Sequence, residues 1–221
     1  KRDITIKHLL TMSAGFEFVE NVNNYVYWSN NWTKNILQLP IPTLPGSGFN
    51  YGTIQTHLLS AVLTKVSGMD TLTFAQSHLF NHMGVSINRW DKAPEGTFFG
   101  GSEMYLTPRD MAAFGQLYLQ NGEFRDQQLV PKEWVSRSLE PSFHDTWRGA
   151  GYGYSWWIKQ LSGYAVYFAI GYGGQTIMNI PDENMVIVYT ADYPSPFYDH
   201  KQREQNLENF VTLDILPLLS P

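Results

Sequence analysis

The sequence contains no cysteine, and this absence removes several kinds of chemistry at once. A chain without thiols has no disulfide framework, no thiolate zinc site, no iron–sulfur cluster and no cysteine nucleophile. Charged residues are also scarce, at 16% against a usual ~25%. The formal net charge is −5 and Lys and Arg form no runs, which argues against a nucleic-acid partner.

Long apolar runs are missing as well. No stretch approaches the ~18 residues of a membrane-spanning helix, and residues 1–5 lack the apolar region of a signal peptide. We therefore expect no membrane span, and we expect the sequence to start inside a longer protein. The hydrophobic content of 43% and aromatic content of 15%, in 221 residues, predict a folded chain with a substantial core.

Six segments carry the signals of helices. The clearest is expected over 107–120, which begins with the cap and first-turn pair Thr107-Pro108. Over 53–67, apolar residues recur three and four positions apart, which predicts an amphipathic helix facing a core. A short helix is expected to start after Thr5 and to end at Gly15. The remaining helices are predicted at 71–82, 131–140 and 200–216.

After residue 151 the apolar pattern changes to the period of two that is typical of strands. Four strands are predicted, and the tight link 181–184 makes the last two an antiparallel hairpin. Because helices come first and antiparallel strands follow, the fold class is α+β. The runs cover 152–158, 165–170, 176–180 and 185–191. We expect a mostly helical subdomain with active-site loops over 1–145, and antiparallel strands with a C-terminal helix over 146–221.

Several familiar sites are not supported by the sequence. There is no G-x-S-x-G elbow and no G-x-x-x-x-G-K-S/T phosphate loop, and residues 171–176 lack the last glycine of a dinucleotide loop. His78 and His82 are four apart, as helical zinc ligands would be, but Leu79 stands where the usual glutamate would follow. We interpret both as surface histidines of a helix and predict no metal site.

Two glycine-rich stretches are candidates for chemistry. The first, over 45–53, brings Tyr51 to a helix N-terminus, whose partial positive charge favours an anion. The alternative is a tyrosine that caps a turn and packs its ring. In the second, over 169–175, three glycines interrupt a predicted strand. This indicates a bulge or a group such as a substrate carbonyl approaching the backbone, and the alternative is a crossing of two sheets.

Taken in order, these segments resemble the serine β-lactamase-like hydrolases, a family that includes class C β-lactamases, DD-peptidases, family VIII esterases and nylon-oligomer hydrolases. Tyr51-Gly52-Thr53 is similar to the Tyr-x-Asn element of that family. The helix of 4–15, the helix of 57–68, the helix start at 106–115 and the strands around 152–157 and 171–175 follow in the same order. The resemblance implies a β-lactamase/DD-peptidase-like fold, an antiparallel sheet flanked by helices, with the N-terminal strands missing.

The sequence also departs from that family. The nucleophile of the family is the serine of a Ser-x-x-Lys motif, and no serine in the 221 residues has a lysine three positions later. We therefore expect this chain to be inactive by itself. The second motif ends in Thr53 instead of asparagine, and Gly171-Tyr172-Gly173 stands where Lys-Thr-Gly or His-Thr-Gly is usual. The loss of that cation disfavours recognition of a β-lactam carboxylate.

By this resemblance, Tyr51 would be the general base of a serine hydrolase that cleaves esters or amides through an acyl-enzyme. The backbone N–H of Gly174, or alternatively of Gly173, would donate to the oxyanion. The residues implied to line the pocket are Tyr172, Gln175, Thr53 and Trp157, and the aromatic segment 25–32 would cover it. No metal and no cofactor is implied, and the expected ligand is a small ester or amide.

Other interpretations stay open. One is a catalytically inactive relative that binds peptidoglycan peptides or a partner protein, and another is an aromatic-rich carbohydrate-binding module. We also expect a missing N-terminal segment, or a second copy of the chain, to cover an exposed edge of the sheet. The cellular location is open, although the family and the lack of cysteine favour an exported bacterial protein.

Overall fold

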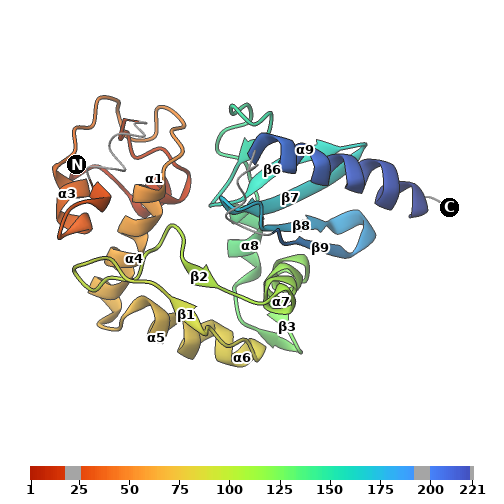
Figure 1. The fold of residues 1–221 in the computed structure, drawn as a ribbon, viewed down its shortest axis with the longest axis horizontal. Coiled ribbons are helices and arrows are strands. Elements are labelled where there is room, and N and C mark those ends of the chain that lie inside the picture. Colours follow the sequence, from red (N-terminus) through yellow and green to blue (C-terminus); the bar gives the residue numbers. More distant parts are fainter. Residues whose placement is uncertain (18–25, 192–199, 220–221) are drawn as a thin grey trace. The chain divides into compact units, whose positions relative to one another are not determined.

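The computed structural model describes residues 1–17, 26–191 and 200–219, and their backbone forms two compact units (Figure 1). The first unit is Lys1–Leu106 and the second is Thr107–Pro221. The sequence places a subdomain boundary at 145/146 instead, and that division stays a prediction. The compact units divide earlier because the helix that starts after Thr107 packs on the strands of the second unit.

The first unit is built around α4 (Thr53–Ser67), which has the bounds predicted from its apolar period. Helices α1 (Ile6–Leu10) and α3 (Trp32–Gln38) pack against it, and buried side chains such as Leu9, Ile36 and Leu58 form the core between them. The helix ends at Gly68, whose φ of 70° is the left-handed conformation that glycine adopts without strain. A helical run follows, made of α5 (Thr71–Ala75), a π-turn (Gln76–Phe80) and α6 (Asn81–Met83). The short strands β1 (Arg89–Trp90) and β2 (Met104–Tyr105) complete the unit.

The first helix is shorter than the sequence predicts. Thr5 caps α1 with the expected side-chain hydrogen bond, but the helix ends at Leu10, well before Gly15. Met12 has a φ of 56°, so the chain turns there, and its carbonyl accepts the Asn50 N–H at 2.7 Å. A contact with a distant loop thus overrides the local signal that the glycine provides.

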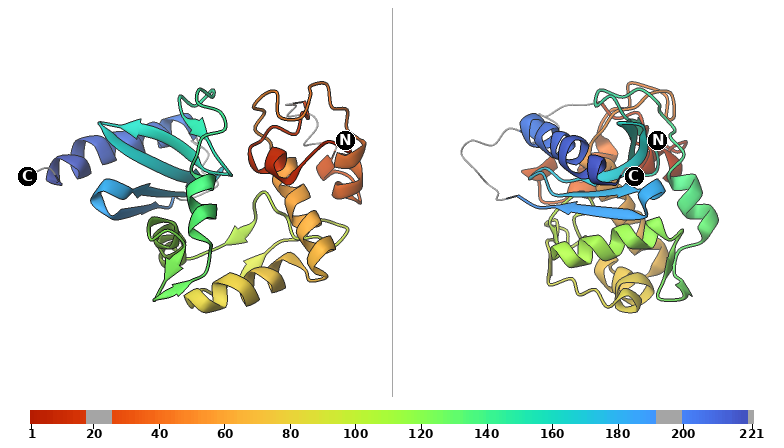
Figure 2. Two further views of the ribbon diagram at one scale, coloured as in Figure 1. Left: turned by 180° about the vertical axis from the view of Figure 1, so that it is seen from behind. Right: turned by 90° about the vertical axis from the view of Figure 1, so that its right-hand side faces the viewer.

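The second unit is a five-stranded antiparallel sheet in sequence order, with helices on both faces (Figures 1 and 2). Its strands are β5 (Gly151–Tyr152), β6 (Trp157–Leu161), β7 (Tyr164–Ile170), β8 (Thr176–Ile180) and β9 (Met185–Tyr189). The hairpin predicted between the last two strands is confirmed, with Pro181–Glu183 as a 3-10 turn. The hairpin of β3 (Glu123–Phe124) and β4 (Gln127–Gln128) and helix α8 (Lys132–Ser138) lie between α7 and the sheet in the sequence.

The register of the sheet separates two faces. Tyr167, Asn179 and Val186 stand opposite one another on the face that carries α7 (Pro108–Leu119). There Gly115 lets the helix approach closely, because a Cβ at this position would come within 2.5 Å of the Val186 side chain. On the other face, Lys159 and Arg148 form ion pairs with Glu208 and Glu204 of α9 (His200–Phe210). The chain then continues through a π-turn (Val211–Ile215) and a 3-10 turn (Leu216–Leu218).

The prediction of a single strand over 152–158 is wrong. The structure has two strands there, β5 and β6, joined by a tight turn in which the Gly153 N–H donates to the Trp156 carbonyl at 2.9 Å. Ser155 lies in the turn with a φ of 62°. A Cβ at residue 153 would come within 2.2 Å of the Ser138 carbonyl oxygen, so the close approach of α8 requires glycine here. Among the described residues, the sheet therefore has five strands where four were expected.

None of the helices in the described ranges is long and apolar enough to cross a membrane.

Candidate active site

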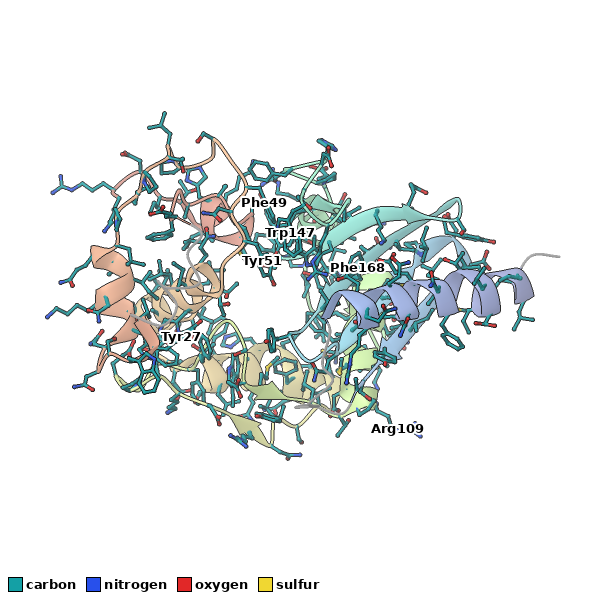
Figure 3. The ribbon with its side chains drawn as sticks, turned by 45° about the horizontal axis from the view of Figure 1, so that its top comes forward. Tyr27, Phe49, Tyr51, Arg109, Trp147 and Phe168 are labelled. Carbon is teal, nitrogen blue, oxygen red and sulfur yellow. The ribbon has the colours of Figure 1, made fainter. Side chains whose placement is uncertain are left out.

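The loop that precedes α4 carries Tyr51, and its phenol side chain is half-buried. The ring lies next to that of Phe49, with the ring centroids 6.4 Å apart (Figure 3). Gly52 is the N-cap of α4 and has no side chain with which to cap it. Tyr51 therefore stands directly before a helix N-terminus, as the sequence predicts, and its ring is not packed in the interior.

The loop is tied to the segment that follows α1. The Gly46 N–H donates to the Ser13 carbonyl and the Asn50 N–H to the Met12 carbonyl, both at 2.7 Å. The Asn50 side chain donates to the Phe16 carbonyl in addition. These hydrogen bonds join residues more than thirty positions apart, so the backbone that leads into Tyr51 is fixed by tertiary contacts.

Thr53, expected in the pocket, is partly covered within the first unit. Its methyl group lies against Gly101, where a Cβ would come within 1.9 Å. Burial raises the pKa of Tyr27, and a side-chain hydrogen bond between Tyr27 and Thr53 partly offsets this effect. Tyr27 also contacts Trp32 and Phe99, with centroids 4.8 and 5.6 Å apart. Tyr27 of the aromatic segment therefore packs beside Thr53, whereas Trp28 is 88% exposed and Tyr25 lies outside the described residues.

A polar cluster that the sequence analysis missed holds this aromatic segment in place. The Glu95 carboxylate accepts the N–H groups of Trp32 and Thr33 at 3.0 and 2.9 Å, and the Thr33 hydroxyl at 2.7 Å. Burial by itself would raise the pKa of Glu95, but these hydrogen bonds lower it to about 2. His57 is 1% exposed and contacts the same carboxylate at 3.4 Å, and burial lowers its pKa. The imidazole is therefore neutral at neutral pH.

The glycine stretch of the second unit is a hairpin loop and not an interruption within one strand. It joins β7 to β8: the Gly171 N–H donates to the Gln175 carbonyl at 2.8 Å, and the Gly174 N–H donates to the Gly171 carbonyl at 2.9 Å. Gly174 has a φ of 88°, the left-handed position that such a three-residue loop reserves for glycine. The Gly174 N–H is therefore engaged within the turn, whereas the Gly173 N–H donates to no atom of the described residues.

The side chains around this turn differ in exposure. Tyr172 is 69% exposed, and the Gln175 amide lies over Gly173, where a Cβ would come within 2.4 Å of its nitrogen. Trp157, also expected in the pocket, is 2% exposed and packs edge-on against Tyr152 in the sheet core, as the alternation of β6 requires. The stem of Arg203 lies beside Gly174, a neighbour from α9 that no local sequence signal indicates.

The two histidines with zinc-like spacing lie on the exposed side of the π-turn and α6. His78 stacks on Phe74 with ring centroids 4.2 Å apart, and its Nδ1 lies 3.0 Å from the Phe74 carbonyl oxygen. In the part of the chain that the structure describes, no three His, Asp or Glu side chains gather as metal ligands would.

Comparison with known proteins supports the resemblance seen in the sequence. The model of the Beta-lactamase family matches residues 1–209. The chain therefore belongs to the β-lactamase family, and its fold is the β-lactamase/DD-peptidase-like α+β fold.

The curated relatives include 6-aminohexanoate-dimer hydrolase from Paenarthrobacter ureafaciens, which is 23% identical over 194 residues. That match covers 79% of this chain and 47% of the relative, so the chain spans about half the length of this relative. Among solved structures, a Bacillus anthracis protein described as a 6-aminohexanoate-dimer hydrolase has a TM-score of 0.75 at 20% identity. The match covers 94% of this chain and 61% of that protein. An octameric penicillin-binding protein homologue from Pyrococcus abyssi has a TM-score of 0.67 at 19% identity, with 94% and 55% covered.

Proposed function

We propose that this chain is the C-terminal part of a serine hydrolase that cleaves small esters or amides through an acyl-enzyme, with Tyr51 as the general base. The observation that carries the proposal is the position of Tyr51: a partly exposed phenol on a loop held by tertiary hydrogen bonds, directly before the N-terminus of α4. Membership of a hydrolase family supports the reaction type. The similarity to a 6-aminohexanoate-dimer hydrolase supports a small amide substrate.

The chemistry follows from the properties of the groups involved. A serine hydroxyl becomes a good nucleophile only when a base takes its proton, and a tyrosine of pKa about 10 needs nearby cations to act as that base. In this proposal a Ser-x-x-Lys motif outside the 221 residues supplies both the nucleophile and a cation. Tyr51 takes the serine proton and returns it to the leaving group, a contribution on the order of 10²–10⁴-fold.

The oxyanion would be bound by the backbone N–H of the nucleophile and by one N–H of the β7–β8 turn. Of the two glycines considered, Gly173 is now the better candidate, because the Gly174 N–H already donates within the turn. Such a donor typically contributes ~3 kcal/mol to lowering the barrier. Tyr172 and Gln175, which lie on the same turn, are the proposed contacts to the substrate.

The test compares acyl-ester turnover by this chain, by a chain that includes any sequence preceding Lys1, and by the Tyr51→Phe variant of the longer chain. We expect turnover in the longer chain only, with a loss of about 10²-fold or more in Tyr51→Phe because the base is removed. Full activity in Tyr51→Phe would exclude Tyr51 as the base. Turnover by the 221 residues alone would exclude a nucleophile that lies outside these residues.

One observation favours a second function: these residues contain no Ser-x-x-Lys motif. If the whole protein also lacks that motif, we propose an inactive relative that binds peptidoglycan peptides or a partner protein. The sequence before Lys1 distinguishes the two proposals. In addition, β9 pairs only with β8 among the described strands, and its apolar side chains are only partly buried. We propose that a segment outside these residues, or a second copy, covers this edge, and light scattering of the chain tests the second copy.

A further inference from the structure

The side chain of Gln55 is a deeply buried polar group four positions after Tyr51. It is 1% exposed, although it lies in the first turn of α4, only three residues after Gly52. A buried carboxamide costs stability unless both of its ends are hydrogen-bonded. The partners of Gln55 therefore indicate what the side chain does.

Both ends of the amide are used, and they bind two different segments. Gln55 Oε1 accepts the Ala14 N–H at 3.0 Å, and Gln55 Nε2 donates to the Asn50 carbonyl at 2.7 Å. Ala14 lies 41 positions before Gln55, in the segment that follows α1, and Asn50 immediately precedes Tyr51. The amide is a bridge between the Tyr51 loop and the segment of residues 12–16.

The neighbouring contacts make this bridge part of a larger network. Asn50 also donates its N–H to the Met12 carbonyl and its side-chain amide to the Phe16 carbonyl. The backbone N–H and the side-chain amide of Asn50 thus bond residues 12–16, and its carbonyl accepts from Gln55. A Cβ at Gly52 would lie 4.0 Å from Gln55 Nε2, an ordinary van der Waals distance, so the bridge does not depend on glycine at this position. The backbone is thus held both before and after Tyr51.

We propose that Gln55 is a positioning residue, whose carboxamide sets the place of the Tyr51 phenol by fixing the loop before α4 on residues 12–16. This inference rests on the proposed role of Tyr51, and it adds a residue that the sequence motifs do not indicate. In a capping box, glutamine at the third helical position bonds back to the N-cap N–H. Here the same position is used for a tertiary bridge instead. A misplacement of about 1 Å in a catalytic group can cost on the order of 10²-fold in rate, so such a bridge matters for turnover.

The first part of the test measures the loop directly, by amide hydrogen exchange in the 221-residue chain. Gln55→Met is similar in shape but leaves the Ala14 N–H and the Asn50 carbonyl without partners. We expect exchange of the Ala14 N–H, which loses its acceptor, to accelerate about tenfold or more. Exchange of the Asn50 N–H, which donates to the Met12 carbonyl, should accelerate as well because the loop is held less firmly. Gln55→Glu keeps an acceptor for Ala14 but places a carboxylate against the Asn50 carbonyl. In that variant the Ala14 amide should stay protected while the Asn50 amide exchanges faster.

The matched control is Ser60→Ala on the same helix. Ser60 is 4% exposed, and its hydroxyl contacts Thr71 Oγ1 and the Phe98 carbonyl, both at 2.7 Å. This variant also removes buried hydrogen bonds, but it leaves the Tyr51 loop unchanged. We expect it to lower overall stability without faster exchange at Ala14 and Asn50.

The second part measures turnover in the longer chain that carries the nucleophile. We expect Gln55→Met to lower kcat by about 10²-fold with little change in KM, and Ser60→Ala to leave kcat nearly unchanged. Unchanged exchange at Ala14 and Asn50 in Gln55→Met would overturn the inference, as would a loss of kcat no larger than that of Ser60→Ala. Full activity of Tyr51→Phe would instead reject the proposed function, while the exchange pattern would still decide whether Gln55 holds the loop.

Discussion

Replacing Glu95 by glutamine tests whether one carboxylate holds the aromatic segment of the first unit. Glu95 acts as a distant cap for α3, accepting the N–H groups of Trp32 and Thr33 and the Thr33 hydroxyl. Its side chain is 12% exposed. Glutamine has nearly the same shape, but it is neutral, and its amide nitrogen cannot accept a hydrogen bond. The substitution therefore removes charge-assisted bonds with little change in packing.

The magnitude follows from the pKa of Glu95, which is about 2 in the folded chain against an ordinary value of 4.5. A difference of 2.5 units corresponds to roughly 3 kcal/mol, and screening by solvent reduces this to about 2 kcal/mol. Because the folded pKa is the lower one, this stabilisation is fully present above pH ~4.5 and is lost as the pH falls towards 2. Glu95→Gln should therefore destabilise the first unit most at neutral pH, and hardly at all near pH 2.

The assay is urea unfolding of the wild-type chain and of Glu95→Gln between pH 7 and pH 2, together with exchange of the Thr33 amide. Glu103→Gln, an exposed carboxylate of the same unit that accepts the Tyr105 hydroxyl at 3.0 Å, is the control. Burial also lowers the pKa of His57, so protonation of this imidazole adds a loss of stability below pH ~6.5, before that of Glu95 begins. A difference between wild type and Glu95→Gln that stays constant across the pH range, or that matches Glu103→Gln, would refute the reasoning.

Two further substitutions probe the second unit. Asn179 is fully buried, and its side-chain amide has no hydrogen-bond partner among the described residues. Leucine has a similar shape and no polar group to leave unpaired. Asn179→Leu should therefore raise the unfolding free energy by about 1–2 kcal/mol. A lower thermal midpoint would show that the amide has a partner after all, and Asn179→Asp should be destabilising in either case. Gly174→Ala should cost about 1–2 kcal/mol, because its φ of 88° is strained for alanine. Gly48→Ala, at an open position with ordinary φ, is its control, and equal midpoints for the two variants would contradict the expectation.

Much of the fold follows from local signals in the sequence. The helix after Thr107 has its capping box because Thr107 and Asp110 satisfy each other's backbone groups within one turn. The apolar period of 53–67 and Gly68 set both bounds of α4. The period of two and the 181–184 link predicted the β8–β9 hairpin, and the order of these segments was sufficient to recognise the family.

The remaining features depend on partners that are far apart in the chain. Gln55 reaches Ala14 across 41 positions and Glu95 reaches Thr33 across 62, and neither pairing leaves a trace in the residues nearby. The turn at Gly153 and the early end of α1 likewise arise from contacts with other segments. The sequence by itself determined the elements, whose hydrogen bonds close within a few residues. Only the tertiary structure decided how the Tyr51 loop is held, because buried polar groups must find partners wherever the packed chain brings them.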